Sequence, residues 1–432
     1  MAYQATNPTT RSGTTLRLRL TPERRDFWAF TLWVLVTFIQ FPGDELILYP
    51  LALYFTYSIW RDQTKVVPLL ARGWVPLMFC AWCLISPIWA VEPVTALKLS
   101  LYLILTMMIC YHAAAVLTAR QVMRAVVFAT GIVGILSLIW GLAGLAPMNT
   151  GVFEQKNTMG KSMVMLWIAA LAMSLDGGTG PRGRMLAGIL AAVAFFLGVA
   201  SESATAVLLM IGTGGIILLG QIVLKGGINR PSRLALSFVL LAIMFFAMSF
   251  ILPTLQASPV EMILERFGKD STLTGRTGLW NHAGEQIAKE PWLGVGHGGF
   301  WRYNSSPLVQ MIFEDYHKDP WQTFNFHNTY YEIAVHQGYI GLALVVIAII
   351  WTQGLILRGV LRFATMPYIF FLAQSIAVIA RTFTESDFLR HFVLFHMLFW
   401  IAALIVLKEE MNSRHAAPAR RKRPTQKSRR YL

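Results

Sequence analysis

The sequence predicts an all-α polytopic membrane protein, with about twelve transmembrane helices and one large periplasmic loop that contains short helices. Composition is the first reason: 55% of the residues are hydrophobic and only 14% are charged, whereas about a quarter of a soluble domain is charged. Secondly, apolar runs close to the length that crosses a bilayer, about 20 residues, follow one another along the chain. Thirdly, basic residues concentrate in alternate connections between these runs.

The apolar runs form two groups, one on each side of a long polar segment. We predict spans at residues 27–41, 45–60, 73–90, 97–118, 122–146, 159–175, 185–200, 203–224, 233–253, 331–357, 366–383 and 388–407. The segments are then an N-terminal tail (1–26), helices 1–9 (27–253), the large loop (254–330), helices 10–12 (331–407) and a basic tail (408–432). The large loop holds four tryptophans and many glycines, a composition that favours a folded cap over a disordered linker.

The connections alternate between basic and cation-poor, and this predicts the orientation of the chain. Lys and Arg are rare in the short connections around residues 43–45, 91–93, 201–203 and 384–387. The basic set contains Arg61, Lys65, Arg72, Arg120, Arg124, Arg182, Arg184, Lys225, Arg230, Arg233, Arg358 and Arg362. Because basic loops stay in the cytoplasm, we expect both termini to be cytoplasmic and the large loop to lie outside.

The net charge of +15 does not predict a nucleic-acid partner. Much of the excess lies in the tails and in short loops, and the basic runs at 420–423 and 427–430 have no interleaved aromatic residues. We interpret them as a cytoplasmic anchor attracted to anionic membrane lipid. The three cysteines (Cys80, Cys83 and Cys110) fall in apolar runs and are predicted to be buried, unreactive thiols.

The histidines of the large loop do not have the spacing of a metal site. His282, His297, His317, His327 and His336 match no compact ligand motif. We therefore predict no metal and no cofactor. The glycine-rich run at 294–299 lacks the strand–turn–helix context of a phosphate loop, and we interpret it as a tight turn that brings backbone close to substrate or to a neighbouring helix.

Outside the cytoplasm there is no nucleotide pool, so an enzyme there needs substrates that are already activated, such as lipid-linked pyrophosphates. Lys156 lies at the start of a span on the cation-poor side. A cation at a helix N-terminus is a candidate phosphate contact. The alternative is a lysine that only extends its side chain to the membrane surface.

Several arginines are further candidates for holding an anion. Arg276, in Thr-Gly-Arg-Thr-Gly-Leu-Trp, offers a planar donor fork that suits phosphate oxygens. Arg266 and Arg302 compete for this role with less context. The alternative for Arg276 is a surface ion pair. Arg381 lies near Glu385 and Asp387 at an outer helix end, where we favour an ion pair that closes the bundle and consider a substrate role second.

His327 lies where the large loop returns to the membrane, and histidine is the commonest general base near neutral pH. Glu332, just over one turn further on, is placed to orient the following helix or an acceptor. A structural histidine that caps or packs at the membrane surface is the alternative.

Five short motifs, in the same order, resemble the bacterial O-antigen ligase and polysaccharide polymerase superfamily over roughly residues 70–405. They are Gly151-x-Phe153-x-x-Lys156-Asn157-x-x-Gly160, Ser201-x-Ser203-Ala204-Thr205, Gly275-Arg276-x-x-Leu279-Trp280, Pro291-Trp292-Leu293-Gly294-x-Gly296, and His327-Asn328-x-Tyr330-x-Glu332 with Gly338-x-x-Gly341-Leu342. Within the superfamily, the chain looks most similar to exopolysaccharide repeat-unit polymerases of the succinoglycan type.

The resemblance implies a bacterial inner-membrane enzyme that transfers a glycan from undecaprenyl pyrophosphate without a metal. It implies that Arg276 and His327 serve the catalytic site, with Lys156, Asn157, Asn328 and Glu332 in matching motif positions. We predict a polymerase of lipid-linked repeats that works with polysaccharide export and chain-length proteins. The alternatives are a ligase that transfers glycan to lipid A core or protein, and, from another class, a polysaccharide transporter or flippase.

Overall fold

The computed structural model describes residues 21–39, 41–225 and 274–420, and all regular secondary structure in these ranges is helical. The N-terminal helices are α1 (Pro22–Phe38), α2 (Glu45–Arg61), α3 (Gln63–Arg72), α4 (Val75–Ile85), the 3-10 turn η1 (Ser86–Ile88), α5 (Pro93–Val116), α6 (Ala119–Leu142), α7 (Lys156–Leu175), α8 (Pro181–Ala200) and α9 (Ala204–Lys225). The later helices are α12 (Thr274–Lys289), α13 (Pro307–Asp315), α14 (Thr329–Phe363), α15 (Met366–Thr382) and α16 (Leu394–Arg420).

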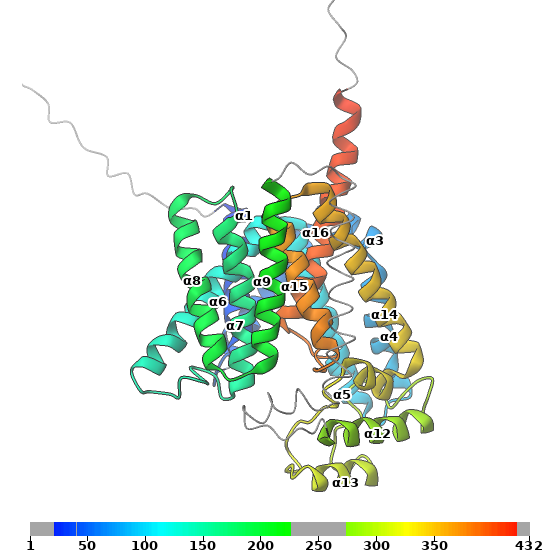
Figure 1. The fold of residues 1–432 in the computed structure, drawn as a ribbon. Coiled ribbons are helices and arrows are strands. Elements are labelled where there is room, and N and C mark those ends of the chain that lie inside the picture. The colour runs from blue at the N-terminus through cyan, green and yellow to red at the C-terminus, as the bar shows by residue number, and fades with distance from the viewer. Residues whose placement is uncertain (1–20, 40, 226–273, 421–432) are drawn as a thin grey trace, which may run out of the picture.

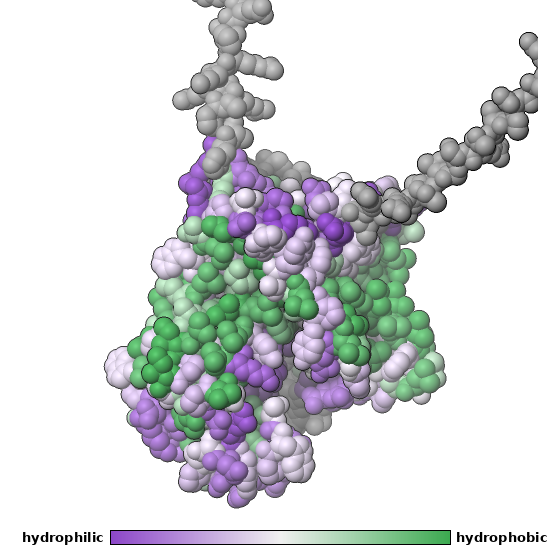
Figure 2. Space-filling view, turned by 180° about the vertical axis from the view of Figure 1, so that it is seen from behind, coloured by the Kyte–Doolittle hydropathy of each residue, from purple (hydrophilic) through white to green (hydrophobic). Residues whose placement is uncertain are grey.

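The long helices form one bundle, with a small polar lobe at one end. Helices α12 and α13 lie together at that end, and α16 extends beyond the bundle at the opposite end (Figure 1). On the face shown in Figure 2, a hydrophobic band lies between two more hydrophilic ends. We call the two ends the cap end and the tail end.

Helix α7 lies at the centre of the larger half of the bundle. It packs on α6, α8, α9 and α15, and 67% of its most apolar window is buried, the highest share among the candidate spans. Small residues allow this close packing, as at Gly160, where a Cβ would meet Ser201 and Ser203. Close approach at small residues is how helices associate in a membrane, where the hydrophobic effect between them is weak.

Six described helices are long and apolar enough to cross a membrane, and the number becomes seven if one bent pair counts as a span. They are α5, α6, α7, α8, the Ala204–Val223 part of α9, and α14. Several long apolar helices in one bundle confirm a multi-pass membrane protein. The predicted span at 233–253 lies outside the described residues, so the total of twelve stays a prediction.

The predicted span at 73–90 corresponds to α4 and η1, and a second short helix, α3, precedes it at a sharp angle. Residues 63–72 and 75–88 form two short helical pieces at an angle of 89°. Gly73 ends the first piece and Pro76 lies in the first turn of the second, so the backbone can bend sharply between them. Hydropathy identified the apolar residues but carries no information about this change of direction.

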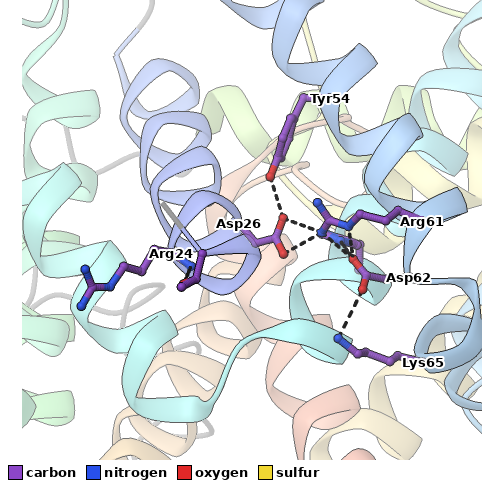
Figure 3. A network of polar contacts seen from close by, with 8 residues as sticks. Arg24, Asp26, Tyr54, Arg61, Asp62 and Lys65 are labelled. Atoms are coloured by element: carbon purple, nitrogen blue, oxygen red, sulfur yellow. Dashed lines mark hydrogen bonds and ion pairs between the residues drawn. The ribbon is translucent and has the colours of Figure 1, made fainter. Parts of the chain in front are cut away.

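At the tail end, a polar cluster joins α1, α2 and α3 (Figure 3). The guanidinium Nη2 of Arg61 donates to both carboxylate oxygens of Asp26, at 2.9 and 2.8 Å, and also to Asp62. Tyr54 donates to Asp26 at 2.6 Å, and Lys65 donates to Asp62 at 3.2 Å. We call these five residues the tail-end cluster.

Candidate active site

Residues 274–328 fold into a compact lobe, which we call the cap. Its interior is apolar and is continuous with the first turns of α14. Trp280 of α12 stacks on Tyr331 of α14 with ring centroids 5.7 Å apart, and the Trp280 indole N–H donates to the Phe326 carbonyl at 2.9 Å. The buried core of the lobe consists of Leu279, Ala283, Ile287, Val295, Phe300, Leu308, Val309, Ile312, Phe313, Phe326, Ala334 and Val335.

The glycine-rich turn fixes the cap to a kink in α14. The backbone of Gly338 leaves the helical region at φ 65° and ψ −173°, and a Cβ there would collide with the Trp292 carbonyl oxygen. The Tyr339 amide donates to the Pro291 carbonyl at 2.8 Å, and the Val295 amide donates to the Val335 carbonyl at 3.0 Å. The run at 294–299 is therefore a close backbone approach to a neighbouring helix, in agreement with the sequence interpretation.

His327 lies in a tightly held turn between the cap and α14. Its φ of 51° is in the left-handed region, which non-glycine residues adopt rarely and which often marks a functional site. The His327 amide donates to Asn325 Oδ1 at 2.8 Å, and the amides on either side, of Phe326 and Asn328, donate to Glu332 Oε2 and Ser386 Oγ. These bonds hold the backbone of the His327 turn in place.

The electrostatic surroundings of His327 keep its ring neutral at neutral pH. Burial lowers its pKa below the ordinary 6.5, and the nearby Arg276 lowers it further, while Glu385 and Glu332 oppose both effects. Its Nδ1 is buried and has no hydrogen-bond partner among the described residues. A neutral imidazole with a free nitrogen is able to accept a proton or to hydrogen-bond a substrate.

Arg276 lies in the first turn of α12, close to the same turn. Burial lowers its pKa below the ordinary value and Glu385 raises it, but a guanidinium keeps its charge at any physiological pH. The described cap therefore places a permanent cation beside a neutral histidine.

The loop between α15 and α16, residues 383–393, connects this turn to a second group of charges. The Thr329 hydroxyl donates to the Glu385 carbonyl at 2.7 Å. Two residues later in the loop, Asp387 Oδ2 accepts from Arg381 Nη2 at 2.6 Å and from Lys161 Nζ at 3.3 Å. Burial alone would raise the pKa of Asp387, but Lys161 and Arg381 overcome this and hold it well below its usual range.

The structure brings some of the predicted site residues together and separates others. Arg276 and His327 are neighbours, and Arg381 forms the predicted ion pair with Asp387. Lys156 instead pairs with the exposed Glu202 at 3.2 Å, and Asn157 is exposed. Arg266 lies outside the described residues.

Two further predicted residues have clear structural contacts. Asn328 caps α14, because its Oδ1 accepts from the amides of Tyr330 and Tyr331 at 2.9 and 3.3 Å. Glu332 is buried and accepts from the Trp301 indole at 2.8 Å and from the Phe326 amide at 2.9 Å. Both residues hold the His327 turn in place.

Sequence reasoning missed Lys161, which lies on α7 five residues after Lys156 and reaches Asp387. One signal was available. Lys161 is a lysine inside an apolar span, and an intramembrane charge is costly unless it has a partner or a function.

Among the described residues, one group has the side chains for a metal ion: Asp26, Asp62 and His112, with ligand atoms within 4.8 Å of one another. It consists of His112 and two residues of the tail-end cluster, Asp26 and Asp62, and Arg61 already donates to both of these carboxylates.

Comparison with known proteins agrees with the predicted resemblance. Residues 186–346, which include Arg276 and His327, match the protein family described as O-antigen ligase. The chain is 27% identical over 310 residues to the exopolysaccharide production protein ExoQ of Rhizobium meliloti, covering 68% of each chain. It is 22% identical over 315 residues to a protein of Rickettsia conorii named as a polysaccharide ligase, covering 66% of this chain and 72% of that one.

These matches confirm the resemblance to the O-antigen ligase and polysaccharide polymerase superfamily. The chain is thus a multi-pass membrane protein whose residues 186–346 are similar to the O-antigen ligase family, and it is related to a protein of exopolysaccharide production.

Proposed function

We propose that this protein is an inner-membrane glycosyltransferase that polymerises undecaprenyl-pyrophosphate-linked oligosaccharide repeats into exopolysaccharide on the periplasmic face. The observation that carries the proposal is the neutral, tightly held His327 beside the permanent cation Arg276. The relation to an exopolysaccharide production protein supports polymer synthesis as the outcome. In this orientation both termini are cytoplasmic and the cap is periplasmic, as the basic loops predict.

The reaction joins two lipid-linked glycans. The acceptor hydroxyl oxygen attacks the anomeric carbon of the donor, the bond from that carbon to the pyrophosphate oxygen breaks, and the configuration inverts. The pyrophosphate leaves on its lipid with the bonding electron pair. No net oxidation or reduction occurs, so the step needs no redox cofactor.

Two side chains act on opposite ends of this displacement. His327 accepts the proton of the attacking hydroxyl, which is the role that its lowered pKa suits. Arg276 donates to the departing pyrophosphate and offsets the charge that develops there, usually a large part of such catalysis. With this protein cation at the leaving group, we propose that the transfer is metal-independent.

A ligase function is the second candidate, favoured by the matched family and by the name of the Rickettsia conorii relative. The same two residues would then direct finished polymer onto lipid A core or a protein. The two functions differ in the acceptor that receives the glycan. In the cell, either activity would be followed by export and chain-length proteins.

A strain that carries His327→Ala tests the proposal and separates the two candidates. With the protein at its normal membrane level, a lost polymerase leaves single repeats, whereas a lost ligase leaves full-length polymer on the lipid carrier. Long polymer at normal yield would show that the assignment of His327 is wrong.

A further inference from the structure

The buried charges around Asp387 do not balance. Both Lys161 Nζ and Arg381 Nη2 bond to the same carboxylate oxygen, at 3.3 and 2.6 Å. The Arg381 and Asp387 side chains are each 6% exposed and Lys161 is 30% exposed. One carboxylate neutralises only one of the two cations.

Among the described residues, the neighbouring charges do not remove the excess. Glu385 acts electrostatically on Lys161 and also on Arg276, so it is shared between two cations. We define the cap-end cluster as Lys161, Arg276, Arg381, Glu385 and Asp387, which holds three cations and two carboxylates. An uncompensated charge in a buried place is costly, and such a charge is retained where a ligand neutralises it.

The cluster also has an unused donor. Arg381 Nε is buried and has no hydrogen-bond partner among the described residues, although Arg381 Nη2 bonds Asp387 and its guanidinium lies 5.0 Å from the Phe395 ring centroid. Unpaired buried donors are rare because they lose their bonds to water. A phosphate oxygen would satisfy this one.

The position of the cluster connects it to the His327 turn. The loop that carries Asp387 also supplies the Glu385 carbonyl to Thr329 and the Ser386 hydroxyl to the Asn328 amide. Lys161 comes from α7, the most buried span. Cations from the bundle and a cation from the cap therefore converge on this loop.

We propose that Lys161 and Arg381 bind the pyrophosphate of the lipid-linked donor, and that Asp387 is a positioning residue that holds the two cations toward it. This inference rests on the proposed function for the identity of the donor. Lys156, which occupies the matching motif position, then has no role in binding, because Glu202 neutralises it at the surface. Two cations from the bundle and one from the cap would surround a single pyrophosphate.

Direct binding tests the inference without turnover. The purified full-length chain is reconstituted in lipid nanodiscs, and its dissociation constant for undecaprenyl pyrophosphate is compared with that for undecaprenyl monophosphate. We expect the wild type to prefer the pyrophosphate, and Lys161→Gln to weaken its binding about tenfold or more, the size of one charge-assisted hydrogen bond. The matched control Lys156→Gln, on the same helix, should change binding less than about twofold, as exposed ion pairs do.

Further variants separate binding from folding. Lys161→Arg keeps the charge and should bind undecaprenyl pyrophosphate within about threefold of the wild type. Asp387→Asn should keep binding but lower kcat, because the cations remain and lose their fixed position. Equal binding by Lys161→Gln and wild type, or an equal loss in Lys156→Gln, would overturn the inference.

The same data distinguish the inference from the proposed function. A wild-type protein that binds the pyrophosphate through Lys161, yet transfers no glycan, would support this site and contradict the polymerase. If the wild type transfers glycan but Lys161→Gln binds undecaprenyl pyrophosphate with full affinity, the polymerase is supported and the Lys161 site is contradicted.

Discussion

The two ends of the bundle both bury charged side chains, but they balance them differently. In the tail-end cluster, two carboxylates (Asp26 and Asp62) meet two cations (Arg61 and Lys65), and the acids are bonded to their partners (Figure 3). In the cap-end cluster, three cations meet two carboxylates. A balanced buried cluster needs no further partner and fixes helices to one another, whereas an unbalanced one has a reason to receive an anion.

The comparison predicts that substitutions at the cap end change turnover more than stability, and that substitutions at the tail end change stability more than turnover.

The largest effect is expected from His327→Ala. Loss of a general base should lower kcat about a hundredfold to ten-thousandfold, measured with purified protein and a lipid-linked donor. His317→Ala is a matched control, because His317 is exposed in the same cap and has a similar φ of 50°. An equal loss in both variants would contradict the assignment.

Arg276→Ala should lower kcat about a hundredfold to a thousandfold, because it removes a donor to the charge that develops on the leaving group. Arg276→Lys should recover only part of this, since an ammonium lacks the planar fork. The control is Arg302→Ala, whose exposed side chain bonds Thr95 at 2.7 Å. Normal turnover by Arg276→Ala in a correctly folded protein would remove this residue from the site.

At the tail end, Arg61→Ala should destabilise the fold by about 3–5 kcal/mol, because it leaves Asp26 and Asp62 buried without their main partner. Thermal melting in detergent measures this. Turnover by the protein that remains folded should be unchanged. Lys65→Ala, at a side chain 57% exposed, should cost about 0–1 kcal/mol. If Arg61→Ala lost turnover without losing stability, the tail-end cluster would not be purely structural, and the proposed difference between the two ends would be wrong.

The smallest of the predicted effects is the dependence of turnover on pH. The pKa of His327 is lowered from 6.5 by burial and by Arg276, and a general base must be neutral. Turnover should therefore stay level at neutral pH and fall only when the pH drops through this lowered pKa. The free energy of unfolding changes with pH in the same direction. The contribution from neutral His327 is present above pH 6.5 and is lost as the pH falls through the lowered pKa.

Arg276→Gln sharpens the same measurement. Removing the cation takes away one of the two leading causes of the lowered pKa, so the acid limb of the residual kcat/KM should move to higher pH. An unmoved limb would show that another group titrates.

The helices and the cap residues could be predicted from the sequence, because hydropathy and short motifs depend only on residues that are close together in the chain. It placed His327 at the return of the loop and Arg276 in the cap, and it paired Arg381 with its acids. It selected Lys156 because the motif and the charge pattern pointed there. Which lysine of α7 reaches Asp387 depends on the packing of α7 against the α15–α16 loop, 226 residues away in sequence, and no local pattern contains that information.

The bend at Gly73 was not predicted from the sequence, for a related reason. The predicted span begins at residue 73, and the helical piece 63–72 lies before it at 89°; a hydropathy window carries no information about direction. Likewise, only the folded chain shows how two residues hold the His327 turn. Asn328 accepts from the amides of Tyr330 and Tyr331, and Glu332 accepts from the Trp301 indole.

The central claim is that the cap-end cluster receives a pyrophosphate-linked glycan and extends it. The most direct measurement incubates purified wild-type protein with an undecaprenyl-pyrophosphate-linked repeat and follows product length on a gel, together with release of undecaprenyl pyrophosphate. We predict a ladder of longer products with stoichiometric release of the carrier by the wild type, and single repeats with His327→Ala. Single repeats alone from a folded wild-type protein that binds the donor would contradict the account.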